Sequence, residues 1–286
     1  MKKLGILGFL ILIFGVLTIA QTDESKQYQS YQSLHPDNFF DSRYFSKEPH
    51  KVGEAPSSKI YGAVLPHHLI AYKLIDQVFN LLESQKPPLI ILIGPNHFNQ
   101  GERISTSTWG WQTPFGIVET DRETIDTLAK NALVKISDDI FTSEHSMGNL
   151  MPFIKYYLPE AKVVPIIFHH DLSKAEANFL STELAHLAQE KDAVIMASID
   201  FSHYLTNKEA QLKDQETLEI IRTKNIPRLL SLGDAHLDSP GSMVTMLLTM
   251  EKLGIEDFEV LQHTNSGILI GNDLIETTSY FTMIFR

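Results

Sequence analysis

The chain has 286 residues, with 24 lysine and arginine residues against 35 aspartate and glutamate residues, and 43% of its residues are hydrophobic. This composition is typical of a globular protein, and the length fits one large domain or two small ones. The net charge of −11, without a basic stripe, argues against a nucleic-acid partner, because binding to phosphates needs clustered lysine and arginine. The chain contains no cysteine. This excludes disulfides, cysteine nucleophiles and thiolate ligands, so any metal must be held by nitrogen and oxygen atoms.

The N-terminus carries the clearest local signal. Two lysines follow Met1, residues 4–20 form an uninterrupted apolar run, and the sequence becomes polar from Gln21. A basic head, an apolar run and a small residue at Ala20 are typical of a secretory signal peptide. The run is also close to the shortest length that spans a bilayer, so an uncleaved anchor stays open. We therefore predict that residues 1–20 are a signal peptide or a transmembrane anchor, and that the protein is exported, either secreted or tethered to the membrane.

Residues 21–57 are rich in glutamine, serine, aspartate, lysine and proline and show no sustained period. We interpret them as a polar linker or a loosely packed arm. Four aromatic residues of this segment are candidates for docking on the domain that follows: Phe39, Phe40, Tyr44 and Phe45.

From residue 59 onward, short apolar runs alternate with amphipathic stretches. Strands separated by helices indicate an α/β domain with a mainly parallel or mixed central sheet and helices on both faces. Because no repeat or second linker interrupts the pattern, we predict one domain over residues 58–286. The apolar runs predict strands at residues 60–65, 88–93, 162–168, 193–198, 258–262 and 279–285. The amphipathic stretches predict helices at residues 69–84, 122–132, 147–157, 173–191, 207–224 and 240–253.

Histidines follow three of the predicted strands. His67 and His68 come after the first strand, His97 after the second, and His203 after residues 193–198. A single loop histidine is more often a solvated or capping residue than a ligand. However, ligands of open α/β sheets bind beyond the carboxyl ends of the strands, so these side chains converge on one crevice if the strands are neighbours.

Neutral imidazole binds iron, zinc, copper and nickel, and two kinds of site stay open. Two histidines with one carboxylate and open positions are the pattern of non-haem iron and oxygen chemistry. Three protein ligands with a water suit a hydrolytic zinc ion equally well. Two further polar groups precede predicted helices, where capping of the helix is the ordinary interpretation. They are Glu144-His145-Ser146 and Asp238-Ser239-Pro240.

Five short motifs occur in the order that is seen in the Memo family, which includes the bacterial and archaeal AmmeMemoRadiSam system protein B. Five in the right order make a specific match, and the resemblance covers roughly residues 60–286. Memo proteins are similar in fold to the class III extradiol dioxygenases, so the resemblance implies a sheet with a metal pocket at its edge. The motifs are Pro66-His67, Gly94-Pro95-Asn96-His97, Thr113-Pro114, Glu144-His145-Ser146 with Pro152, and Asp200-Phe201-Ser202-His203.

The resemblance also implies a set of metal ligands. In the family, the histidines of the Pro-His and Gly-Pro-x-His motifs bind the metal, and they match His67 and His97. The third family ligand is a cysteine, which is absent here; Ser239 aligns with it, and Asp238 stands beside it. Since the related dioxygenases use a carboxylate at the equivalent place, we hypothesise that Asp238 is the third ligand. The alternative is that Ser239 has replaced the ligand and that metal binding is weakened or lost.

Six other residues receive roles from the same resemblance. His203 matches the acid/base histidine of the dioxygenases, and imidazole can take and give a proton near neutrality. His145 and Asp200 are expected to act with it by orienting ligands or substrate. The expected pocket is completed by His68, Asn96 and Glu144.

These features favour a metal-dependent redox enzyme, with iron or copper preferred over zinc and with a substrate that the sequence does not identify. Two alternatives stay open. One is a non-catalytic member of the family that binds a small molecule, a peptide or a protein, and the other is a zinc-dependent hydrolase. The family's usual name also implies a radical-SAM protein and an AMMECR-type protein as partners, although the expected export of this chain conflicts with contact to cytosolic partners.

Overall fold

Four parallel strands form the centre of the main sheet. The computed structural model describes residues 33–45, 58–130 and 133–286. In this part of the chain, neighbouring strands pair in the order β2 (Gly62–Leu65), β9 (Val194–Ser198), β3 (Leu89–Pro95) and β8 (Lys162–Phe168). Nearly every residue of these strands is buried, as expected of continuous apolar runs in a sheet that is covered on both faces.

Antiparallel strands extend the sheet at both edges. β12 (Thr277–Phe285) lies beside β2 and pairs with β10 (His203–Leu205) and β11 (Phe258–Asn265). β4 (Ile104–Thr106) runs antiparallel to β8, and β7 (Lys135–Ile136) pairs with β4. The described strands of this sheet therefore follow the order β10-β12-β2-β9-β3-β8-β4-β7, with β11 on β12. A second, small sheet contains β1 (Leu34–His35), β5 (Gly110–Thr113) and β6 (Gly116–Val118).

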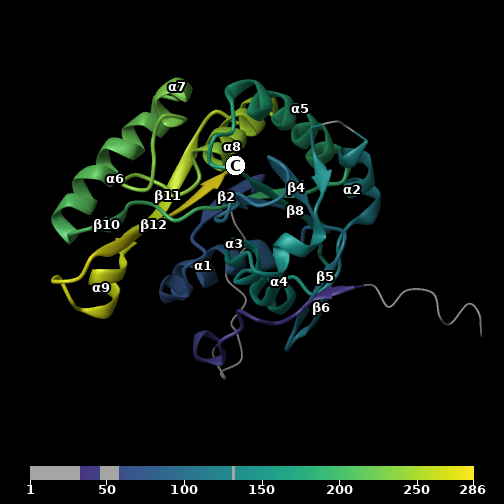
Figure 1. Cartoon of the computed structure of the whole chain (residues 1–286), viewed down its shortest axis with the longest axis horizontal. Helices are drawn as coiled ribbons and strands as arrows, with labels where there is room; N and C mark the ends of the chain where they lie inside the picture. The colour runs from purple at the N-terminus through teal and green to yellow at the C-terminus, as the bar shows by residue number, and fades with distance from the viewer. Residues whose placement is uncertain (1–32, 46–57, 131–132) are drawn as a thin grey trace, which may run out of the picture. The chain divides into compact units, whose positions relative to one another are not determined.

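Helices cover both faces of the main sheet, with α5 and α8 on one side of the central strands and α1, α3 and α4 on the other (Figure 1). Ile91 of β3 points into a core with α5 and α8, while Ile90 points into a core with α1 and α4, because successive side chains of a strand alternate between its faces. The α-helices are α1 (Tyr72–Glu83), α2 (Arg122–Ala129), α3 (His145–Gly148), α4 (Met151–Tyr157), α5 (Lys174–Glu190), α6 (Asn207–Arg222), α7 (Ile226–Leu229), α8 (Pro240–Lys252) and α9 (Ser266–Ile270). The described residues also form short 3-10 helices, namely η2 (Ser42–Tyr44), η3 (Leu69–Ala71) and η4 (Asp138–Thr142).

The predicted fold class, an α/β domain with a mixed sheet and helices on both faces, is confirmed. The four central strands lie within two residues of their predicted bounds. The predicted helix over residues 147–157 is instead two short helices, α3 and α4, and Pro152 lies in the first turn of α4, where its missing N–H costs no hydrogen bond. Short strands such as β4 and β6 escaped prediction because three residues are too few to show a period.

The predicted membrane segment needs correction. Among the residues that the structure describes, no helix has the length and apolar character needed to cross a bilayer. The longest of them, α5, has 17 residues and carries charged side chains, whereas a span needs about 20 apolar residues. The prediction of a transmembrane helix is therefore not supported by any described helix. The exported or membrane-tethered location that was drawn from it loses its support as well. Residues 1–20, on which that prediction rested, lie outside the described residues.

Part of the predicted linker packs against the domain. Leu34 to Arg286 form one compact unit, and within it the ring of Phe45 packs against that of Phe153 of α4 at a centroid distance of 4.5 Å. The boundaries predicted at residues 20 and 57 stay predictions, because residues 1–32 and 46–57 lie outside the described part of the chain.

Candidate functional site

Three neighbouring parallel strands end at the candidate site. His67 lies two residues beyond β2, Asp200 two residues beyond β9, and His97 two residues beyond β3. Because β2, β9 and β3 pair with one another in register, their carboxyl ends meet at one edge of the sheet. The strand order thus brings together His67 and His97, two of the histidines that were expected to converge if their strands are neighbours.

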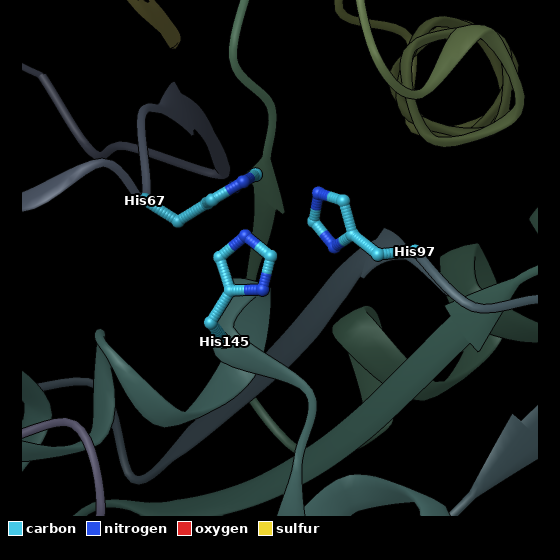
Figure 2. A group of neighbouring side chains, drawn as sticks. All are labelled: His67, His97 and His145. Atoms are coloured by element: carbon cyan, nitrogen blue, oxygen red, sulfur yellow. The ribbon is translucent and has the colours of Figure 1, made fainter.

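Three imidazole rings face a common space, as Figure 2 shows for His67, His97 and His145. The centroid of the His67 ring lies 5.2 Å from that of His97 and 5.3 Å from that of His145. The rings of His97 and His145 stack at 4.0 Å. One nitrogen atom from each ring lies within 4.8 Å of the other two, which is close enough for a single ion to reach all three.

The tautomer of His67 leaves its Nε2 atom free for a ligand bond. Its Nδ1 atom lies 3.0 Å from the Oγ atom of Ser198, and that hydroxyl donates its proton to the carbonyl of Ser146 at 2.7 Å. Ser198 must therefore accept from Nδ1–H, and Nε2 carries no proton. Burial lowers the pKa of His67 well below its ordinary value, and the nearby His97 and His145 lower it further. The ring is thus neutral, which is the form that binds metals.

Glu144 orients His97. The buried carboxylate accepts from the backbone N–H of His97 at 2.9 Å, from its Nδ1 atom at 2.7 Å, and from the N–H of Ser146 at 2.9 Å. Burial alone would raise the pKa of Glu144, but the hydrogen bonds from His97 and Ser146 lower it to about 2. A carboxylate on Nδ1 directs Nε2 of the same ring toward the centre of the site. Burial lowers the pKa of His145 as well, with His97 as the next cause.

Two buried aspartates complete the centre. The Nε2 atom of His67 lies 3.5 Å from Asp200 and 3.4 Å from Asp238, and the Nε2 atom of His97 lies 3.8 Å from Asp238. Asp238 reaches this place because its N–H donates to the carbonyl of Asp200 at 3.1 Å. The Oδ1 atom of Asp238 is buried without a hydrogen-bond partner. Burial raises the pKa of Asp200, and burial together with the Asp200 charge raises that of Asp238 well above its ordinary value.

Ser239, the alternative to Asp238 as a ligand, has its hydroxyl engaged elsewhere. It caps α8, accepting from the N–H of Ser242 at 3.3 Å and sharing a 2.6 Å hydrogen bond with the hydroxyl of Ser242. The geometry therefore favours Asp238 over Ser239 as the residue that faces the site.

Of the remaining predicted residues, some lie at the site and one shapes a loop that carries a site residue. His203 begins β10, interacts electrostatically with Asp200, and has a buried Nδ1 atom without a partner; burial lowers its pKa. The ring of His68 bonds the hydroxyl of Tyr280 at 2.8 Å. Asn96 instead closes the turn after β3, since its side chain donates to the carbonyl of Gln100 at 2.6 Å and accepts from its N–H. Asn96 thus shapes the loop that carries His97.

Sequence reasoning missed Ser198, whose hydroxyl decides the tautomer of His67. Serine is common in strands and turns, and a pattern assigns no ligand role to it. Its place as the last residue of β9, at the carboxyl end of a strand, is the one signal that marks it.

A wide surface cavity lies at the other end of the sheet. It has a volume of about 790 Å³ and is lined by residues near the end of α5, before β2 and after α8 and β12, among them Lys59, Tyr61 and Arg286. These charged groups are already paired, Lys59 with Asp192 and Arg286 with Glu259. The chemistry of the side chains, and not the presence of a cavity, therefore marks the carboxyl end of the sheet as the candidate site.

Comparisons with known proteins bear on the family and on the fold. A family model described as Memo-like protein matches residues 38–284. The MEMO1 family protein of Methanosarcina barkeri is 31% identical over 239 residues, which cover 81% of this chain and 88% of that protein. The MEMO1 family protein of Methanopyrus kandleri is 30% identical over 238 residues, covering 79% of this chain and 83% of that protein. Among solved structures, an uncharacterized protein from Escherichia coli K12 superposes with a TM-score of 0.52 at 12% identity, over 78% of this chain and 99% of that chain, a likeness of fold alone.

Proposed function

The chain belongs to the Memo-like protein family, and from this premise we propose that it is a metal-binding redox enzyme that uses iron or copper. The observation that carries the proposal is the buried cluster in which His67 and His97 face Asp238. A buried carboxylate without a cationic partner is costly. The unpartnered Oδ1 atom of Asp238 therefore fits a cation in the space between these side chains.

The predicted ligand set, His67, His97 and Asp238, has the composition of the two-histidine, one-carboxylate sites of non-haem iron enzymes. Both imidazoles direct Nε2 toward Asp238, because Ser198 and Glu144 occupy their Nδ1 atoms. Such a set leaves coordination positions open for substrate or for oxygen.

A fourth and a fifth donor lie next to this set, and they bear on the identity of the metal. His145 completes a group of three imidazoles with His67 and His97, while Asp200 completes a group with His67 and Asp238. Each group shares two members with the proposed set, so His145 or Asp200 would be a further donor to the same ion. Nitrogen ligands suit copper and zinc, whereas added carboxylate oxygen suits iron.

The protein's own groups have separate roles in the proposed reaction. The metal, when bound, supplies electron transfer and polarises an oxygen atom of the substrate. Asp200 and His203 interact with each other and form the pair that takes and returns a proton beside it. Glu144 holds the orientation of His97, and the hydroxyl of Tyr280 in β12 holds the ring of His68.

Metal content of the purified protein tests the proposal. We expect one iron or copper ion per chain, lost in the variants His67→Ala and Asp238→Ala because each removes a donor from the same ion. Oxygen uptake with catechols then tests for redox turnover. Unchanged metal content in Asp238→Ala would refute the carboxylate ligand, and bound metal without turnover of any substrate would count against the enzyme.

Two other functions keep a specific observation in their favour. The group of three imidazoles, with water as a fourth ligand, is a pattern of hydrolytic zinc, and zinc as the bound ion would favour it. The use of Ser239 as a helix cap in place of the family cysteine favours a non-catalytic binding protein, and a chain that takes up no metal would favour that function. A radical-SAM or AMMECR-type partner stays a prediction.

A further inference from the structure

Residues 142–148 carry two groups of the candidate site, Glu144 and His145, on a short and irregular stretch of chain. η4 ends at Thr142 and α3 covers only His145 to Gly148. On its inner side, this stretch is held by the ends of β3 and β9. The hydroxyl of Ser146 donates to the carbonyl of Pro95 at 3.0 Å, and the hydroxyl of Ser198 donates to the carbonyl of Ser146 at 2.7 Å.

The outer side of the same stretch is covered by residues 34–45, which we call the clamp. At one end, the Nδ1 atom of His35 bonds the hydroxyl of Thr142 at 3.0 Å, and the side chain of Asn38 donates to the carbonyl of Thr142 at 3.5 Å. At the other end, the ring of Phe39 lies directly on Gly148, since a Cβ atom added there would meet Phe39 Cδ2 at 2.2 Å. The two contacts bracket Glu144 and His145.

The clamp is itself anchored on regular structure. β1 pairs with β5, placing Leu34 beside Gly110 and His35 beside Trp111. His35 is fully buried, its ring lies 4.3 Å from that of Trp111, and its Nε2 atom bonds the hydroxyl of Ser107 at 2.8 Å. The clamp (purple in Figure 1) therefore links the small sheet to residues 142–148.

We propose that the clamp sets the geometry of the metal centre, with His35 and Phe39 acting as positioning residues for Glu144 and His145. The proposal rests on the proposed function, because its effect is read at the metal. Neither residue touches the site. Their action passes through Thr142 and Gly148 to Glu144, and from there through the 2.7 Å hydrogen bond to the ring of His97. Partners beyond the ligands control a metal site because they fix the direction of the ligand rings.

The test uses the full chain with cobalt(II) as the probe, since the visible spectrum of cobalt reports its ligands and their geometry. Phe39→Ala removes the contact with Gly148, and His35→Phe keeps the ring on Trp111 but loses the bond to Thr142. The matched control is Phe40→Ala, because Phe40 is the next residue of the clamp and packs on Phe45 and Phe115 instead. Amide hydrogen exchange of residues 142–148 provides a readout that needs no metal.

We expect Phe39→Ala and His35→Phe each to weaken cobalt binding about tenfold, to change the cobalt spectrum, and to speed exchange across residues 142–148. Phe40→Ala should leave the spectrum and this exchange unchanged. Gly148→Ala should act like Phe39→Ala, because its methyl group displaces the ring. The double variant with Phe39→Ala and Gly148→Ala should bind cobalt no more weakly than either single variant, since both substitutions act on the same contact.

Unchanged exchange of residues 142–148 in Phe39→Ala would overturn the proposal, and so would an equal loss in Phe40→Ala, which would indicate general destabilisation. If Phe39→Ala does not fold, His35→Phe decides in its place. If the unaltered chain binds no cobalt, the proposed metal function fails, and the exchange rates alone decide whether the clamp holds residues 142–148.

Discussion

Charged side chains have different surroundings at the two ends of the parallel sheet. At the amino end, Lys59 pairs with Asp192 and Arg286 with Glu259, on side chains that keep contact with solvent. At the carboxyl end, Asp200 and Asp238 are buried beside neutral histidines, and no lysine or arginine of the described chain pairs with them. A charge at the surface is stable on its own, but a buried one needs a counter-charge. The contrast indicates that the carboxyl end is built to receive a cation.

The largest expected effect comes from neutralising Asp238, the buried carboxylate at the carboxyl end of the sheet. Asp238→Asn should weaken metal binding more than about 100-fold, beyond the usual effect of a partner outside the ligand set. In metal-free protein the same change should leave the melting temperature unchanged or raise it, because it removes a buried carboxylate without a counter-ion. Titration calorimetry and thermal unfolding with and without metal measure both. A lower melting temperature of the metal-free variant would show that Asp238 already has a stabilising partner.

A smaller loss of metal affinity is expected when the charged group that is removed, Glu144, is not itself a proposed ligand. Glu144→Gln keeps the shape of the side chain but loses the carboxylate that accepts from the ring of His97 at 2.7 Å. We expect metal affinity to fall by about 10- to 100-fold with the fold intact, measured by competition with a chelator of known affinity. Affinity equal to that of the unaltered chain would mean that Glu144 does not orient His97.

The clamp offers a pH test that is separate from the metal ligands. Burial lowers the pKa of His35 to about 4, against the opposing charge of Asp138, while an unfolded histidine titrates near 6.5. Between these values the unfolded chain binds a proton that the folded chain does not. The stability from neutral His35 is therefore complete above pH 6.5 and is lost as pH falls toward 4, by about 1.4 kcal/mol per pH unit.

Urea unfolding at pH 7 and pH 5, in the presence of a chelator, measures this loss. The free energy of unfolding should fall with pH by about 2 kcal/mol less in His35→Gln than in the unaltered chain. The comparison of slopes removes any constant destabilisation by the substitution. Equal slopes in the two proteins would mean that His35 takes up its proton at the same pH in the folded and the unfolded chain.

The smallest effect is expected at the amino end. Lys59→Met removes the partner of Asp192, and a surface ion pair contributes less than about 1 kcal/mol. Metal affinity should not change, because the substitution lies at the opposite end of the strands from the histidines. Chemical unfolding and a metal titration check the two statements together, and a change in metal affinity would contradict the separation of the two ends.

Part of the site was predictable because its residues follow strands. His67, His97 and Asp200 each stand two positions beyond a strand whose apolar run is visible in the sequence, and parallel neighbours bring such positions together. His145 and Glu144 were recognised through family resemblance, but their distance from His97 was not, since it depends on a helix as short as α3. Ser198 and His35 carried no pattern that distinguishes them from ordinary polar residues.

The amino-acid sequence alone determined the α/β class, the central strands and the resemblance to the Memo family, because these depend on periodic burial and on local motifs. It did not determine which strand lies beside which, the direction of each imidazole nitrogen, or the place of residues 34–45 against residues 142–148. Those features arise from contacts between segments far apart in the chain, such as the bond between His35 and Thr142. Such contacts leave no period in the sequence, so only the tertiary structure decides them.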